Sequence, residues 1–394
     1  MAAHAMESSA ASASSFGSGL GLGWDNVLQS VRKLASGDGV GQGQVDWNLL
    51  SSYAGLLGLA TFSIYAGANG SLPKDPVKKV MKPTETAEGE KEDEKEEEED
   101  DDDDKDEETE RMSADDAWLF PIIGSVALVL LYTIVKYLGD TWINWLLGWY
   151  FALAGVGSVW NSSISLTRYL VGETRWKSFE KVKVSVKKGA HVVFGASLRT
   201  PSIILLPLSV VPSGLYVMLG SKGRSVLLTD VLALSFAYNA LSLLKIDSFK
   251  TGTILLSGLF VYDVWWVFGT DVMVKVATTL DVPIKLLWPK SVLLDSARGY
   301  TMLGLGDVVI PGTFIALALR YDHHRNGGKK GPKPYFYMSL GGYVAGMVMT
   351  MYVMDRYGQA QPALLYLSPC CIVSFLVTGM VRREVGRAWS WQDM

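Results

Sequence analysis

Two aspartates stand inside hydrophobic segments, where a lipid bilayer disfavours charge. Asp263 lies in GTILLSGLFVYDVWWVFGT, residues 252–270, and Asp307 lies in YTMLGLGDVVIPGTFIALALR, residues 300–320. Both segments approach the ~20 apolar residues that cross the hydrocarbon core of a bilayer. Because a carboxylate at that depth is costly, each aspartate is a candidate functional residue.

The spacing of the two aspartates predicts that they meet. Asp263 lies seven residues before the end of its segment, and Asp307 lies seven residues after the start of the next. Consecutive spanning helices run antiparallel, so at 1.5 Å per residue both carboxyls are expected about 10 Å inside the same membrane face. Two carboxyls brought together share a proton. In aspartic proteases the ionised member takes a proton from water and the protonated member activates the peptide carbonyl.

Three short motifs follow one another on three separate hydrophobic segments. They are Tyr262-Asp263, Gly304-Leu305-Gly306-Asp307 and Gln361-Pro362-Ala363-Leu364. Together they resemble the YD, GxGD and PAL motifs of the intramembrane aspartyl proteases. From about residue 115 to 380, the chain is more similar to the signal peptide peptidase family than to presenilin.

The resemblance assigns roles to the motif residues. It implies that Asp263 and Asp307 are catalytic, and that the enzyme is an intramembrane aspartic endopeptidase. The remaining motif residues would bind substrate or shape the active site: Tyr262, Gly304, Leu305, Gly306, Gln361, Pro362, Ala363 and Leu364. From its own residues, Tyr262 is equally open to a hydrogen bond within the site or to simple packing.

Nine hydrophobic segments are expected to form transmembrane helices that position these motifs. They cover residues 47–67, 117–137, 143–162, 202–219, 226–244, 252–270, 300–320, 335–353 and 361–380. The chain is therefore predicted to be an all-α, polytopic membrane protein with about nine transmembrane helices, of the presenilin and signal peptide peptidase type.

Composition divides the chain around this body. Residues 1–46 are rich in Ala, Ser and Gly and are predicted to form a flexible tail with no cleaved signal peptide. The protease domain then covers 47–380, including a loop, 68–116, that is predicted to be disordered. Residues 85–110 of this loop hold 19 acidic residues and three lysines, and so dense a run of like charge repels itself. The rest of the chain is basic, with 33 Lys and Arg against 21 acidic residues. Residues 381–394 are predicted to be a short cytosolic tail.

The distribution of Lys and Arg predicts the orientation in the membrane. With the N-terminus outside, the cytosolic loops and tail hold 26 of these residues and the opposite side holds 10. The positive-inside rule then places the N-terminus in the lumen and the C-terminus in the cytosol. The loop 271–299, between the two catalytic segments, would be lumenal. The resemblance implies the endoplasmic reticulum membrane, although the ending SWQDM lacks a lysine-based retrieval signal.

Expected partners follow from this orientation and from the resemblance. They are membrane lipid and the transmembrane helices of substrate proteins, with a preference for a cytosolic N-terminus (type II orientation) that includes remnant signal peptides. No nucleic acid, metal or organic cofactor is expected, and a homo-oligomer stays open. The histidines form no HExxH motif and no Gly-x-Ser-Gly occurs, which argues against zinc and serine intramembrane proteases. The adjacent Cys370 and Cys371 are implausible as a mutual disulfide.

Two other functions compete with proteolysis. Carboxylates in spanning helices also serve as proton or ion relays in transporters, and a receptor or chaperone could hold hydrophobic helices without cleaving them. The equal depth of the aspartates, the third motif and the lack of an evident inverted repeat favour the protease. Asp230, a third intramembrane acid, lies near the start of its segment and is interpreted as an interfacial residue facing water.

Overall fold

The computed structural model describes eleven stretches of the chain: 47–72, 111–172, 175–176, 178–188, 191–219, 225–270, 272–280, 282–290, 299–329, 331–357 and 361–393. The predicted tail 1–46 and most of the predicted acidic loop 68–116 lie outside these residues. At the described ends of that loop, the flanking helices extend to Gly70 and begin at Ala114, and Arg111–Met112 form a short strand.

Nine helices of 18 residues or more run through the described residues, one for each predicted segment. They are α3 (Trp47–Gly70), α5 (Ala114–Leu138), α6 (Asp140–Val171), α8 (Thr200–Met218), α10 (Val226–Leu243), α11 (Phe249–Phe268), α13 (Gly306–Arg325), α14 (Pro334–Tyr357) and α15 (Leu364–Arg382). The predicted all-α polytopic class is confirmed. Seven of these helices are long and apolar enough to cross a membrane. The other two are α6 and α13, so the count of nine spans stays a prediction.

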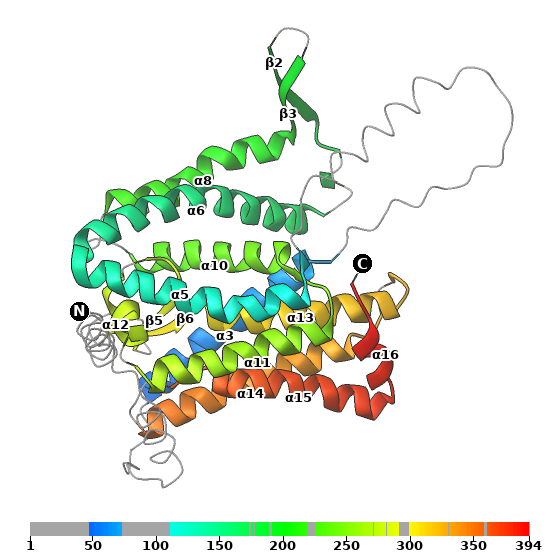
Figure 1. Ribbon diagram of the computed structural model, residues 1–394. Helices are drawn as coiled ribbons and strands as arrows, with labels where there is room; N and C mark the ends of the chain where they lie inside the picture. Colours follow the sequence, from blue (N-terminus) through cyan, green and yellow to red (C-terminus); the bar gives the residue numbers. More distant parts are fainter. Residues whose placement is uncertain are drawn as a thin grey trace, which may run out of the picture.

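Short elements occupy the connections between these helices. Strand β1 (Arg111–Met112) pairs parallel with β4 (Lys245–Ile246), while β2 (Lys181–Lys188) with β3 (His191–Arg199) and β5 (Lys285–Pro289) with β6 (Tyr300–Gly304) form antiparallel hairpins. Two short helices, α12 (Val272–Thr279) and α16 (Val385–Ser390), complete the set. The β2–β3 hairpin projects from the helices, and β5–β6 lies beside α12 at one end of the bundle (Figure 1).

Helix α13 forms the centre of the bundle. Every residue from Pro311 to Asp322 is buried, and α3, α10, α11, α14 and α15 surround the helix. A helix that is covered on all sides needs small residues where its neighbours approach. Gly312 is one of these, since a Cβ there would lie 2.6 Å from the side chain of Leu241 on α10. The helix that carries Asp307 is therefore held from every direction.

An aromatic cluster joins the three helices that carry the motifs. Phe249 of α11 stacks on Phe375 of α15, with ring centroids 4.1 Å apart. Phe314 of α13 meets both rings edge-on at 5.7 and 5.9 Å. Close approach of α11 and α13 also depends on Gly252, because a Cβ there would lie 2.7 Å from the Phe314 ring. The packing thus holds the motif-bearing helices at a set spacing.

The predicted helix over 300–320 is wrong at its start. Helix α13 begins at Gly306, and Tyr300–Gly304 form strand β6 instead. Thr301 and Leu303 are buried while Met302 and Gly304 are exposed, which is the alternation of a strand. A short apolar run does not distinguish a strand from a buried helix. Pairing with β5, a partner in the loop 271–299 that was predicted only as a connection, decides the conformation.

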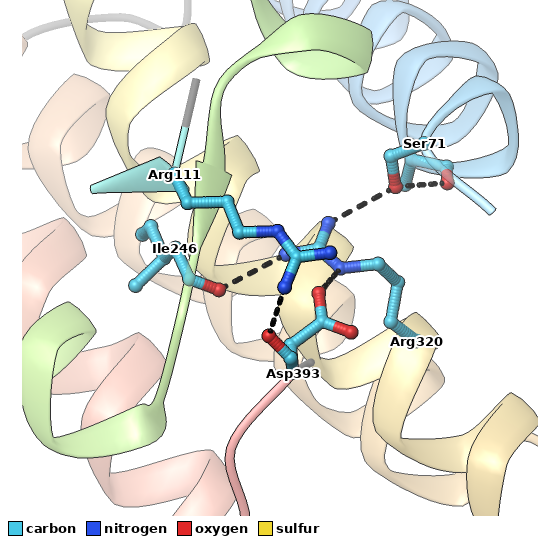
Figure 2. Close-up of polar contacts among 6 residues, drawn as sticks. Ser71, Arg111, Ile246, Arg320 and Asp393 are labelled. Carbon is cyan, nitrogen blue, oxygen red and sulfur yellow. Dashed lines mark hydrogen bonds and ion pairs between the residues drawn. The ribbon is translucent and has the colours of Figure 1, made fainter. Parts of the chain in front are cut away.

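The C-terminal segment is docked, whereas the sequence predicts only a short tail over 381–394. Helix α16 packs on α11 and α15, and Gln392 forms a β-bridge with Ser248. Figure 2 shows how the chain end is held. The buried Arg320 of α13 donates to the Asp393 carboxylate at 2.5 Å, to the Ser71 hydroxyl at 3.2 Å and to the Ile246 carbonyl at 3.3 Å. Arg111 donates to the Asp393 carbonyl at 3.0 Å. We call these five residues the C-terminal latch.

Asp247 lies beside the latch, between α10 and α11. Its Oδ1 is buried and has no hydrogen-bond partner among the described residues. Burial raises the pKa of Asp247 above its ordinary value of 3.8; Arg111 opposes this shift, and Asp116 and Asp393 add to it. The folded protein therefore binds this proton more tightly than the unfolded chain does.

We predict that Asp247→Asn raises the midpoint of thermal unfolding at pH 7. The stability contributed by a group with a raised folded pKa is fully present below the unfolded pKa and is lost as pH rises through the folded pKa. Asparagine does not ionise, so the variant does not lose this stability as pH rises. The gain in unfolding midpoint over the unmodified protein should therefore be absent near about pH 3.5, where Asp247 is mostly protonated, and should appear above about pH 4. We expect less than about 1 kcal/mol, because solvent screens this partly exposed group. Thermal scans in detergent would measure the gain, and a lower midpoint for the variant at pH 7 would contradict the prediction.

Candidate active site

The two predicted catalytic aspartates lie at the same end of α11 and α13. Asp263 is five residues before the end of α11 and is 3% exposed, and Asp307 is the second residue of α13. The two side chains are close enough that the charge of Asp263 acts on Asp307. The structure thus brings the two carboxyls together, but Asp307 starts a helix and does not lie seven residues into one. The strand β6 supplies the residues that the sequence assigned to its first two turns.

The third motif reaches Asp263 through a backbone hydrogen bond. The amide groups of a helix's first turn have no acceptor within the helix. At the start of α15, Ala363 stands at the N-cap position and offers no side-chain acceptor, and Leu364 donates its N–H to Asp263 Oδ2 at 2.9 Å. Asp263 therefore caps α15 from a neighbouring helix. The positive end of the helix dipole favours negative charge on that carboxylate.

The two glycines of the second motif have different surroundings. A Cβ on Gly304 would lie 3.3 Å from Asp307 Oδ2, so the Asp307 carboxyl sits directly over the Gly304 backbone. At Gly306 the nearest neighbour of a Cβ would be 3.9 Å away, which is an ordinary contact. Between them, Leu305 donates its N–H to the Ile284 carbonyl at 2.9 Å and extends the pairing of the β5–β6 hairpin. The closeness of the Asp307 carboxyl thus explains why residue 304 is a glycine, but it does not explain the glycine at 306.

Two other predicted site residues differ in how they are placed. Tyr262 packs towards Gly124 of α5, and its ring centroid lies 6.3 Å from that of Trp266. No hydrogen bond joins its hydroxyl to another described residue, which favours the packing interpretation. Gln361, the first residue of the third motif, has a buried side-chain amide, and neither its nitrogen nor its oxygen has a hydrogen-bond partner within the described ranges. The donors and the acceptor of this amide are therefore unused within the described residues.

Tyr343 of α14 belongs to this site although the sequence analysis does not include it. Its side chain is fully buried, and the charge of Asp307 acts on it. Its hydroxyl finds no hydrogen-bond partner in the part of the chain that the structure describes. A single tyrosine in an apolar helix has the same sequence pattern whether it packs or serves a site, so only the fold identifies it.

The interpretation of Asp230 as a water-facing residue is wrong. Asp230 is 8% exposed, and its Oδ1 accepts a hydrogen bond from the Leu287 N–H of β5 at 2.8 Å. Strand β5 packs against α10 and α3, and the Trp288 ring covers Gly55. The sequence predicted only a loop over 271–299, and therefore gave no sign of a strand whose N–H could donate to Asp230.

The fold and the site together define a multi-pass α-helical membrane protein with two adjoining carboxyls at one end of its central helix. Comparison with known proteins agrees with this class. The chain matches the signal peptide peptidase family over residues 104–394 and therefore belongs to that family.

Three relatives show how far the similarity extends. The chain is 35% identical to the human signal peptide peptidase over 288 residues, which cover 72% of this chain and 74% of the human protein. It is 34% identical to a probable intramembrane protease of Schizosaccharomyces pombe, over 70% of this chain and 82% of that protein. It is also 41% identical to the intramembrane protease 2 of Caenorhabditis elegans, over 42% of this chain and 38% of that protein.

Proposed function

We propose that this protein is an intramembrane aspartic endopeptidase that hydrolyses peptide bonds within the transmembrane segments of other proteins. The observation that carries the proposal is the hydrogen bond from Leu364 to Asp263, with Asp307 alongside. This bond gives the two carboxyls different surroundings, and aspartic-protease chemistry requires an acid and a base. Membership of the signal peptide peptidase family supports the same conclusion.

The different surroundings favour one division of roles within the dyad. The Leu364 N–H and the start of α15 stabilise negative charge on Asp263, so the proton that the pair shares resides on Asp307. Asp263 then accepts a proton from a water molecule as its oxygen attacks the peptide carbonyl. Asp307 donates its proton to the carbonyl oxygen, which gives a neutral tetrahedral diol. Asp263 then returns its proton to the amide nitrogen while Asp307 takes a proton from a diol hydroxyl, so the C–N bond breaks, an amine and a carboxylic acid are released, and the dyad regains its starting protonation.

The substrate must be unwound before it can react, because a helix ties its carbonyls in i→i−4 hydrogen bonds. The residues around the dyad can hold an extended strand. Strand β6 ends next to Asp307, and the glycine at 304 leaves its backbone accessible. The amide of Gln361, which has no partner among the described residues, lies three positions before Leu364 in the chain. An added strand would pair through its backbone, and such pairing is directional.

Orientation and location complete the proposal. We place the N-terminus in the lumen and the C-terminus in the cytosol of the endoplasmic reticulum membrane, on the basis of the Lys and Arg count and of family membership. Substrate segments would then have a cytosolic N-terminus, which includes signal peptides that remain in the membrane after their proteins are released.

We predict that the protein prefers one orientation of the same helix. The measurement uses membranes with matched substrates that carry one transmembrane segment in both orientations. We expect at least about a tenfold difference in cleavage rate, the ratio that 1.4 kcal/mol produces, which is roughly one backbone hydrogen bond. Equal rates, or a preference for a lumenal N-terminus, would refute the topology or the directional pairing. Protease protection of the C-terminus would show which of the two is wrong.

Assays on the purified protein can distinguish proteolysis from the two competing functions, transport and helix binding without cleavage. A signal-sequence peptide in detergent should be cut within its apolar region, and mass spectrometry would identify the products. Binding of the peptide without cleavage would indicate a receptor or chaperone. Proton flux in liposomes without cleavage would indicate a transporter.

A further inference from the structure

The β5–β6 hairpin connects Asp230 to the dyad through a continuous series of backbone pairs. Lys290 donates its N–H to Gly299 and Leu305 donates its N–H to Ile284, both at 2.9 Å. Between these ends the two strands pair in register, with residue 287 opposite 302 and residue 285 opposite 304. Any displacement of β5 is therefore passed to the residues immediately before Asp307.

The register also determines which backbone groups face outward. In an antiparallel pair, hydrogen-bonded and non-hydrogen-bonded positions alternate. Since Lys290–Gly299 and Ile284–Leu305 are hydrogen-bonded pairs, residues 285, 287, 302 and 304 stand at non-hydrogen-bonded positions. Their N–H and C=O groups point away from the partner strand. The Leu287 N–H agrees with this register, because it points away from β6 and donates to Asp230.

The two edges of the hairpin thus have different partners. The outer edge of β5 is held by Asp230, a buried carboxylate on α10. The outer edge of β6 presents the backbone of Met302 and Gly304, both exposed, and within the described residues β6 pairs with β5 alone. That free edge ends three residues before Asp307. A substrate strand that paired with this edge would lie beside the carboxyl of Asp307.

We propose that Asp230 is a positioning residue for proteolysis: by fixing β5, it sets the register in which β6 presents a substrate strand to Asp263 and Asp307. This inference rests on the proposed function. An acceptor on α10 at this point ties the hairpin to the helical body, so that β6 is held at a defined place when the substrate pairs with it. Without this acceptor, the hairpin would still form, but its position relative to the dyad would vary.

Another buried aspartate supplies a matched control. Asp322 of α13 is fully buried, and its Oδ2 accepts the Phe336 N–H of α14 at 2.9 Å, much as Asp230 accepts from β5. It lies 15 residues along α13 from Asp307, about 22 Å at 1.5 Å per residue, and does not touch the hairpin. Loss of this carboxylate removes a comparable hydrogen bond at the other end of the helix.

The experiment compares Asp230→Ala, Asp230→Asn and Asp322→Ala in the full chain, with a signal-sequence peptide as substrate. We expect Asp230→Ala to lower kcat by roughly 10- to 100-fold, the effect of misplacing reacting groups by about 1 Å. Its products should also spread to neighbouring peptide bonds. Asp230→Asn keeps an acceptor oxygen and should restore both the rate and the single set of products. Asp322→Ala should lower the thermal midpoint without changing the product masses.

Amide hydrogen exchange gives a second readout that does not require activity. Exchange over residues 284–290 and 299–305 should rise in Asp230→Ala and stay unchanged in Asp230→Asn and Asp322→Ala. Unchanged products and unchanged exchange in Asp230→Ala, or failure of Asp230→Asn to restore them, would overturn the positioning role. If the unmodified protein cleaves no membrane peptide, the proposed function fails, and the exchange at the hairpin still decides whether Asp230 holds it.

Discussion

Replacement of either Asp263 or Asp307 by asparagine should abolish cleavage of a membrane peptide while the protein stays folded. A single carboxyl cannot be both the base that activates water and the acid that protonates the carbonyl. The loss should be about 10³-fold or more, within the range that general acid–base catalysis contributes. The double variant should be no slower than either single variant, because residues that act as a unit have non-additive effects.

Asp322→Asn is the control for this pair. It neutralises another buried carboxyl on the same helix and leaves an oxygen to accept the Phe336 N–H. It should therefore keep most of the activity. Thermal scans of all the variants would show that the loss is chemical, since removing a buried charge should not weaken the bundle. Activity above a few per cent in Asp263→Asn or Asp307→Asn would refute the dyad.

The second large effect is expected at the C-terminal latch. Asp393→Ala removes the carboxylate that pairs with Arg320, whose side chain is 3% exposed. Among the described residues, the buried cation then keeps two acceptors, both neutral: the Ser71 hydroxyl and the Ile246 carbonyl. Breaking one partner of a buried ion pair costs about 3–5 kcal/mol. We expect the lower end of this range, because the Asp393 side chain is 19% exposed. Thermal unfolding in detergent should show a lower midpoint.

A second ion pair between the same two regions provides the comparison. Arg325 of α13 pairs with Glu384 at 3.2 Å, but both side chains are partly exposed, at 28% and 20%. Glu384→Ala should cost less than about 1 kcal/mol, as for a surface pair. Adding Arg320→Met to Asp393→Ala should recover part of the loss, since it removes the uncompensated charge. Equal midpoints for Asp393→Ala and Glu384→Ala would show that the latch does not stabilise α13.

Much of the helical architecture was predictable from composition alone. A bilayer leaves few ways to satisfy the backbone, so long apolar segments form helices whatever their neighbours are. The described residues accordingly contain a long helix at each predicted segment, and the two aspartates at matching ends of antiparallel helices lie together. The three motifs identified the helices that meet at the site, and family membership is confirmed.

The errors share one physical cause, because each depends on contact with another element that the local sequence pattern does not show. Residues 300–304 became a strand since β5 lies beside them. Asp230 became a hydrogen-bond acceptor since the same β5 passes α10. The chain end became a latch since a buried arginine on α13 needs a carboxylate. Tyr343 entered the site because α14 packs against α13.

The sequence by itself thus determined where the long helices lie, apart from the start of α13, and which residues can perform acid–base chemistry, because side-chain polarity in a lipid environment decides both. The tertiary structure alone decided how the surroundings of the two carboxyls differ and which acceptor holds strand β5. These properties depend on single hydrogen bonds between distant backbone and side-chain groups, from Leu364 to Asp263 and from Leu287 to Asp230. Local sequence patterns contain no information about such bonds, because they exist only after the helices have packed.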